Sequence, residues 1–228
     1  MTDEILPEQE WDKAFRPYAL EIGFLLREWN QLQERLGSLF ASLVCHSNHD
    51  LGRAIWHAIP NDRFQRNMLR ELASFMFNPE HSIHEGGVKN PNASKFATAL
   101  WADILWLVDS ADKLGPRRDA AAHSPVAFLV GDPGEFVAKD IFGNPLAKSL
   151  KRANLLKEFR VYRERAAALH KHAVTIARVV DLFWKGTQLQ PLPDRPAWPE
   201  RPGQKKDASQ SRQAGTKRHR SRRRSSRG

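Results

Sequence analysis

The sequence contains a single cysteine, Cys45, so no disulfide can form within the chain. A lone cysteine is typical of proteins from a reducing compartment, where disulfides do not accumulate. No stretch approaches the 18 uninterrupted apolar residues that indicate a membrane-spanning helix. The first eleven residues are acidic and lack the apolar run of a secretion signal. These absences predict a soluble, cytoplasmic protein with no membrane segment.

Most of the chain also lacks an excess of charge of either sign. Residues 1–194 carry 24 basic and 24 acidic side chains, whereas residues 195–228 carry twelve basic and two acidic ones. The whole formal net charge of +10 therefore lies in the C-terminal tail. A polyanion such as a nucleic acid would be attracted through this tail rather than through the neutral part of the chain.

Apolar residues are abundant enough for a large core, at 41% of 228 residues with seven Trp and twelve Phe. From residue 15 to residue 43 they recur at alternating spacings of three and four, which predicts a long helix beginning near Pro17. The same pattern over 155–183 predicts a second long helix ending near Gly186. Shorter helical regions are predicted between them, at about 51–77 with a break at Pro60, and at about 92–113.

Two long helices enclosing two shorter ones predict an all-α fold, an antiparallel four-helix bundle over residues 15–186. Residues 1–14 form an N-terminal lead-in. Residues 126–130 and 135–142 flank Gly131-Asp132-Pro133-Gly134 and predict a small β-hairpin inserted between helices. Residues 187–228 contain five prolines within 191–202 and then polar and basic residues, which predicts a stiff spacer and a disordered basic tail.

The stretch Arg118-Asp119-Ala120-Ala121-Ala122-His123 combines a permanent cation, a carboxylate and a group that can move protons. Gly115-Pro116 before it and Ser124-Pro125 after it predict an isolated short helix. Arg117 and Arg118 would lie in its first turn, where free backbone N–H groups and two guanidinium groups form an anion site suited to phosphate. This stretch is the strongest candidate for a functional site.

The order Arg, then Asn, Asp or His, then three residues and His resembles the signature of the HEPN superfamily. Members are small helical bundles, many of them metal-independent ribonucleases, and they carry the motif between the third and fourth helices. Requiring Asn, Asp or His in the second place lowers the chance expectation from about 0.9 to roughly 0.12 matches in this chain. A second Arg-to-His spacing, from Arg165 to His170, fails the requirement because Ala166 follows the arginine.

The resemblance implies a reaction in which the ribose 2′-OH attacks the adjacent phosphodiester and leaves a 2′,3′-cyclic phosphate and a 5′-OH. His123 would move the proton, and Arg118 would stabilise charge on the phosphoryl oxygens. Asp119, which shares a helix face with His123, would hold the imidazole in one tautomer. Contacts to the RNA substrate are assigned to residues beside the motif and to the tail, namely Arg117, Ser124, Lys217, Arg218, Arg220, Arg222, Arg223 and Arg224.

The resemblance also implies partners. On a straight helix Arg118 and His123 point about 140° apart, so their convergence needs a long side chain, a distorted turn or a second subunit. HEPN proteins usually place two motifs across a dimer seam, and the apolar surplus of the third helix, including Trp101 and Trp106, suits such a homodimer. A toxin or phage-defence effector of this kind would have an antitoxin or a nucleotidyltransferase as partner. The tyrosine that such a transferase modifies in some relatives is replaced here by Pro125.

Two alternatives stay open. The chain could be a catalytically silent HEPN-like module that binds nucleotides or a protein, or a helical protein that binds nucleic acid only through its tail. Histidines and the cysteine cluster at Cys45, His46, His49 and His57, and again at His81 and His84, without the ligand spacing of a zinc site. No metal and no cofactor is therefore expected.

Overall fold

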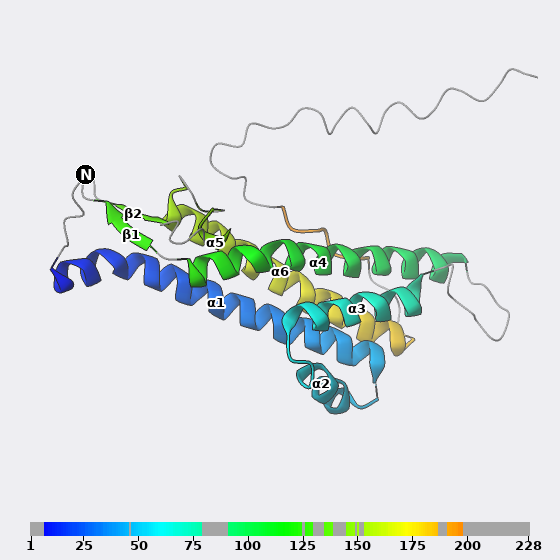
Figure 1. Cartoon of the computed structure of the whole chain (residues 1–228). Coiled ribbons are helices and arrows are strands. Elements are labelled where there is room, and N and C mark those ends of the chain that lie inside the picture. Colours follow the sequence, from blue (N-terminus) through cyan, green and yellow to red (C-terminus); the bar gives the residue numbers. More distant parts are fainter. Residues whose placement is uncertain are drawn as a thin grey trace, which may run out of the picture.

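The computed structural model describes residues 7–45, 47–78, 91–124, 126–129, 135–138, 145–148, 150, 153–186 and 191–197 (Figure 1). These residues are mostly helical, which confirms the predicted all-α fold class. The elements are α1 (Glu8–Val44), α2 (His49–His57), α3 (Asp62–Phe77), α4 (Pro91–His123), β1 (Val126–Leu129), β2 (Glu135–Ala138), α5 (Pro145–Lys148) and α6 (Leu155–Trp184). Among the described helices, none has the length and apolar character needed to cross a membrane.

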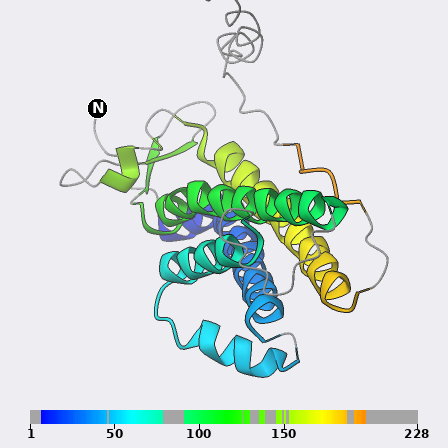
Figure 2. The same ribbon diagram turned by 90° about the vertical axis from the view of Figure 1, so that its right-hand side faces the viewer.

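The long helices pack on one another around a continuous core. α1 lies along α6, α4 packs on both α6 and α3, and α2 packs on the C-terminal part of α1 (Figures 1 and 2). Trp29 of α1 and Tyr162 of α6 are among the largest fully buried side chains. α6 confirms its prediction, because it ends at Trp184 and Gly186 follows with φ +63°.

α1 begins at Glu8, earlier than the predicted start near Pro17, and Pro17 lies inside it. The extra turns are held by tertiary packing. The ring of Phe136 on β2 lies 5.3 Å from Trp11, 5.1 Å from Phe15 and 5.0 Å from Tyr18, measured between ring centroids. Aromatic contacts of this kind help to offset the cost of a proline inside the helix. Part of the predicted lead-in is therefore helical.

α4 runs without interruption from Pro91 to His123, so the predicted isolated short helix at the motif is wrong. Pro116 removes one helical hydrogen bond, yet the chain stays helical through it. The reason lies in burial on both sides of the proline, where Leu114 precedes it and Ala120 and Ala121 follow it in the core. The motif is consequently the last two turns of a helix of 33 residues.

β1 and β2 pair antiparallel, with Val126 opposite Ala138 and Leu129 opposite Glu135. The predicted turn between them, and the predicted continuation of the second strand to Phe142, lie outside the described residues. The predicted disorder of the basic tail likewise falls on residues that are not described.

Candidate functional site

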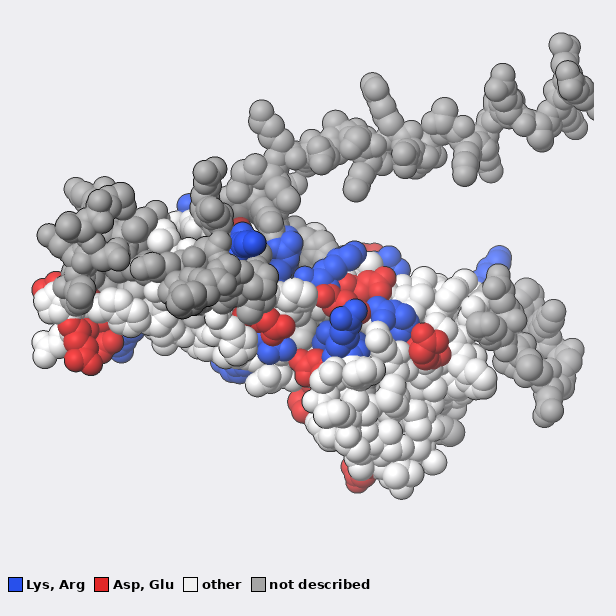
Figure 3. Space-filling view, in the orientation of Figure 1, with Lys and Arg blue, Asp and Glu red and all other residues white. Residues whose placement is uncertain are grey.

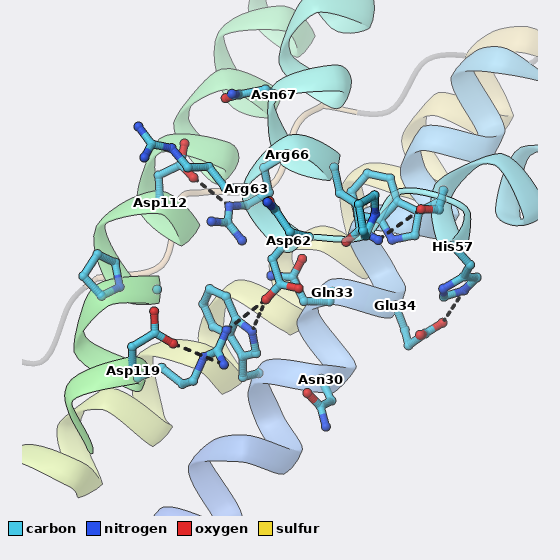
Figure 4. Close-up of a pocket in the computed structure, with 18 of the residues that line it drawn as sticks. Asn30, Gln33, Glu34, His57, Asp62, Arg63, Arg66, Asn67, Asp112 and Asp119 are labelled. Atoms are coloured by element: carbon cyan, nitrogen blue, oxygen red, sulfur yellow. Dashed lines mark hydrogen bonds and ion pairs between the residues drawn. The ribbon is translucent and has the colours of Figure 1, made fainter. Parts of the chain in front are cut away.

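Arg118 leaves α4 toward α1 and α3. Its Nη2 donates a hydrogen bond to Asp62 Oδ2 at 2.9 Å, and its Nη1 lies 3.2 Å from Asp119 Oδ1. The guanidinium carbon lies 4.9 Å from the ring centroid of Trp29, whose Nε1 donates to the same Asp62 oxygen at 3.0 Å. Figure 4 marks these contacts around Asp62 and Asp119. Asp62, the first residue of α3, thus holds α1 and α4 together at one point.

These residues lie in an open cleft of about 1070 Å³ between α1, α3 and α4. Two further arginines of α3 are paired with α4 beside them. Arg66 Nε and Arg70 Nη2 each lie 2.7 Å from an oxygen of Asp112. Burial alone would raise the pKa of Asp112, but hydrogen bonds from Arg70 and Arg66 outweigh it and hold the pKa below its usual value. The cleft therefore contains alternating charges that already neutralise one another.

Figure 3 shows this balance at the surface, where basic and acidic side chains are interleaved over α3 and α4. The described residues of this face do not form a continuous basic patch of the kind that usually binds a polyanion. This agrees with the neutral charge of residues 1–194. A phosphate entering the cleft would have to share or displace carboxylates.

His123 is the last residue of α4 and is exposed to solvent. It does not line the cleft that contains Arg118 and Asp119. Asp119 was expected to orient the imidazole, but no hydrogen bond or ion pair joins these two described residues, and the carboxylate contacts Arg118 instead. Within one chain the structure does not bring Arg118 and His123 together.

Arg117 and Ser124 also differ from the predicted phosphate site. Arg117 leaves α4 toward α6, where its guanidinium carbon lies 5.7 Å from the ring centroid of Tyr162. Burial and a hydrogen bond with Glu158 raise the pKa of Tyr162 to about 12, although the Arg117 hydrogen bond opposes them. The Ser124 hydroxyl is buried without a hydrogen-bond partner. The two neighbouring arginines thus serve different helix contacts, and the candidate tail residues 217–224 lie outside the described part of the chain.

Several cleft residues escaped prediction from the sequence, above all Asp62, Arg66 and Gln33. Gln33 is 9% exposed, and both its amide atoms lack a hydrogen-bond partner, as does Arg66 Nη1. Buried polar groups of this kind favour an ordered water or a ligand. Only Asp62 had a usable signal, because Asn61-Asp62 is a helix start that places a carboxylate at a helix N-terminus.

Metal ligation finds no support in the part of the chain that is described. There, no group of three or more His, Cys, Asp or Glu residues is arranged to hold an ion. Cys45, His49 and His57 belong to this part, whereas His46, His81 and His84 do not. No family model, curated protein or solved structure matches the chain.

Proposed function

We propose that this protein is a HEPN-like, metal-independent endoribonuclease of the cytoplasm, built on an antiparallel four-helix bundle. The observation that carries the proposal is the end of α4. Arg118 and Asp119 lie in the cleft, and His123 follows one helical turn later as an exposed terminal residue. A rise of about 6 Å separates Asp119 from His123 on the same side of the helix. A phosphodiester bound between the ends of two α4 helices would meet the guanidinium of one copy and the proton carrier of the other.

The chemistry follows from these groups. The 2′-oxygen loses its proton and forms a bond to phosphorus, the bond from phosphorus to the 5′-oxygen breaks, and the 5′-oxygen receives a proton. His123 moves protons between these oxygens, and Arg118 stabilises the charge that develops on the phosphoryl oxygens. Asp62 and Asp119 each contact one terminal nitrogen of Arg118 in the free protein, so a bound phosphate would share the guanidinium with these carboxylates or displace one of them.

A homodimer belongs to the proposal, because Arg118 and His123 diverge within one chain. Facing α4 ends would bring Arg118 of one copy near His123 of the other. The apolar surface that favoured a seam along all of α4 is smaller than expected, since Trp101 donates to Ser74 Oγ and Trp106 is covered by Arg195. We therefore place the seam at the C-terminal end of α4. RNA is the proposed substrate, with an antitoxin or a nucleotidyltransferase as a proposed regulatory partner.

One observation favours a second function, a catalytically silent HEPN-like module. Arg118 contacts two carboxylates and an aromatic ring, a set of contacts that would suit a purely structural arginine. In that case the cleft, with its unpartnered Gln33 amide and Arg66 Nη1, would bind a ligand without cleaving it. The ribonuclease requires His123 for proton transfer, whereas the silent module does not require it.

Cleavage of RNA by the full-length protein in excess EDTA tests the proposal. A short single-stranded RNA should yield fragments that end in a 2′,3′-cyclic phosphate and begin with a 5′-OH. The same oligonucleotide with a 2′-deoxyribose at the scissile position should stay intact, because its nucleophile is missing. Cleavage that stops in EDTA, or that proceeds at the deoxyribose, would contradict the mechanism. Complete inactivity of pure protein would favour the silent module.

A further inference from the structure

Residues 191–197, beyond the end of α6, lie against α4 (Figures 1 and 2). Residues 191–197 have no helical or strand structure, and Leu192 packs against the hydrophobic core. Arg195 makes three contacts with α4. Its Nε lies 2.6 Å from Asp103 Oδ1, its Nη2 donates to the Ala102 carbonyl at 3.1 Å, and its guanidinium carbon lies 5.4 Å from the Trp106 ring centroid.

Two ionisable side chains, Asp103 and His172, lie buried beneath this contact. Asp103 and His172 are each 5% exposed, and His172 Nε2 lies 3.4 Å from Asp103 Oδ2. Burial lowers the pKa of His172, against the influence of Asp103, so the imidazole tends to be neutral. A buried carboxylate without a cation is strongly unfavourable. Arg195 is therefore the group that supplies the positive charge to Asp103.

The contact also distinguishes arginine from lysine. The guanidinium donates within its plane to a carboxylate and a carbonyl, and its weakly hydrated face lies over an aromatic ring. A lysine ammonium at the same place could satisfy the charge but could not donate in two directions within one plane. Asp103, the Ala102 carbonyl and Trp106 together form what we name the guanidinium pocket.

The sequence around Arg195 is repeated six residues later. Pro191-Leu192-Pro193-Asp194-Arg195-Pro196 is followed by Ala197-Trp198-Pro199-Glu200-Arg201-Pro202. Both repeats have an apolar residue, proline, an acid, arginine and proline in the same order. Proline-rich chains favour a conformation with three residues per turn, so residues three apart face the same side. Trp198 and Arg201 thus reproduce the spacing with which Leu192 and Arg195 contact the bundle.

We propose that the guanidinium pocket is a binding site for a Pro–acid–Arg–Pro segment, and that Arg201 of the second repeat can replace Arg195 within it. The chain from Gly186 to the arginine lengthens from nine to fifteen residues in the second register. The longer segment costs slightly more entropy to close. The equilibrium constant for placing Arg195 in the pocket is therefore only about twofold larger than that for Arg201. The exchange would move residues 217–224 six positions closer to the pocket along the chain. This inference is independent of the ribonuclease proposal.

Denaturant unfolding of full-length variants tests the exchange. Arg195→Ala should lower the urea midpoint moderately, because Arg201 takes over. Arg201→Ala should leave the midpoint unchanged, and the double variant should show the largest loss, since Asp103 is then buried without a cation. The control variant Arg195→Ala/Arg212→Ala loses as much charge as the double variant, but its second substitution lies outside the repeats. Its urea midpoint should equal that of Arg195→Ala alone. Equal midpoints for Arg195→Ala and the Arg195→Ala/Arg201→Ala variant would exclude the second register.

A peptide tests the pocket itself. Pro-Leu-Pro-Asp-Arg-Pro, added to the double alanine variant, should raise its midpoint saturably, and it should do so at lower concentration than the peptide with lysine in place of arginine, which supplies the charge without the planar contacts. If the double variant does not fold, Arg195→Lys/Arg201→Lys keeps both charges and serves as the host. No effect of the arginine peptide, or an equal effect of both peptides, would overturn the proposed recognition.

Discussion

At the residue scale, Asp62 is the group on which the candidate site depends most. One of its oxygens accepts from both Arg118 and Trp29, so a single carboxylate connects three helices. Its removal would leave the Trp29 N–H without a partner and Arg118 with only Asp119. An arginine held in this way is pre-positioned for the proposed catalysis, and it also contributes to stability. Arg118 is thus expected to have two separable effects.

A double-mutant cycle measures the structural effect. Arg118→Ala and Asp62→Ala should each lower the free energy of unfolding by about 1–2 kcal/mol, given a partly exposed ion pair, a ring contact and a lost hydrogen bond. Their coupling should be about 1 kcal/mol, because the residues are in direct contact. The neighbouring Arg63→Ala is the control and should change little, since Arg63 is exposed. Strict additivity of the two alanine variants would contradict the contact.

His172 should make stability depend on pH. Its pKa is lowered by burial, and the charged groups that face it are Asp103 of α4 and Arg195 of 191–197. The folded protein therefore binds fewer protons than the unfolded chain, whose histidine titrates near pH 6.5. The resulting stability is present above pH 6.5 and is lost as pH falls below it. Urea midpoints between pH 7.5 and 5 should decline less for His172→Gln than for wild type, whereas the exposed His57→Gln should keep the wild-type decline.

At the scale of elements, α4 shows how far local signals can mislead. Gly115 and Pro116 are ordinary helix-breaking residues, and the sequence predicted a boundary there. The structure continues the helix because its flanking turns are buried in the core. Gly115 itself has no positive φ that would require glycine, and it lies near Trp29 and Arg66.

Alanine at Gly115 should destabilise the protein. Gly115 is helical and directly precedes Pro116, and a Cβ on a helical residue before proline crowds the proline Cδ. Gly23→Ala in α1 is the matched helical control, because its Cβ would meet nothing within 4 Å. The control should raise the free energy of unfolding by about 0.5–1 kcal/mol, from reduced backbone freedom in the unfolded chain. A gain of the same size in Gly115→Ala would show that α4 does not continue as a helix into Pro116.

Helices with an unbroken apolar stripe were the predictable part of the fold. α6 ends where Gly186 indicated, because its boundary signal and its packing agree. α1 and α4 extend beyond their predicted limits, because prolines were read as boundaries where burial decides otherwise. Local propensity is a weak prior against tertiary packing. Periodicity identified the elements, and only the packing fixed their ends.

At the scale of the whole molecule, the contacts that define the site were beyond the reach of the sequence. Arg118 and Asp62 are 56 residues apart, and Arg195 and Asp103 are 92 apart. No periodicity or motif relates such pairs, since they meet only when helices pack. The motif itself was visible, as was the neutrality of residues 1–194. The spacing of Arg118 and His123 also indicated that they diverge on a helix. What could not be foreseen is that Asp62 holds Arg118.

The most direct measurement of the central claim compares two histidines in RNA cleavage. His123→Ala should abolish the initial rate in EDTA while leaving helical content unchanged, because the exposed ring makes no described contact. His170→Ala is the matched control from the second Arg-to-His spacing, and it should cleave at the wild-type rate. If His123→Ala cleaves as fast as the wild type, the motif carries no catalysis and the ribonuclease assignment fails.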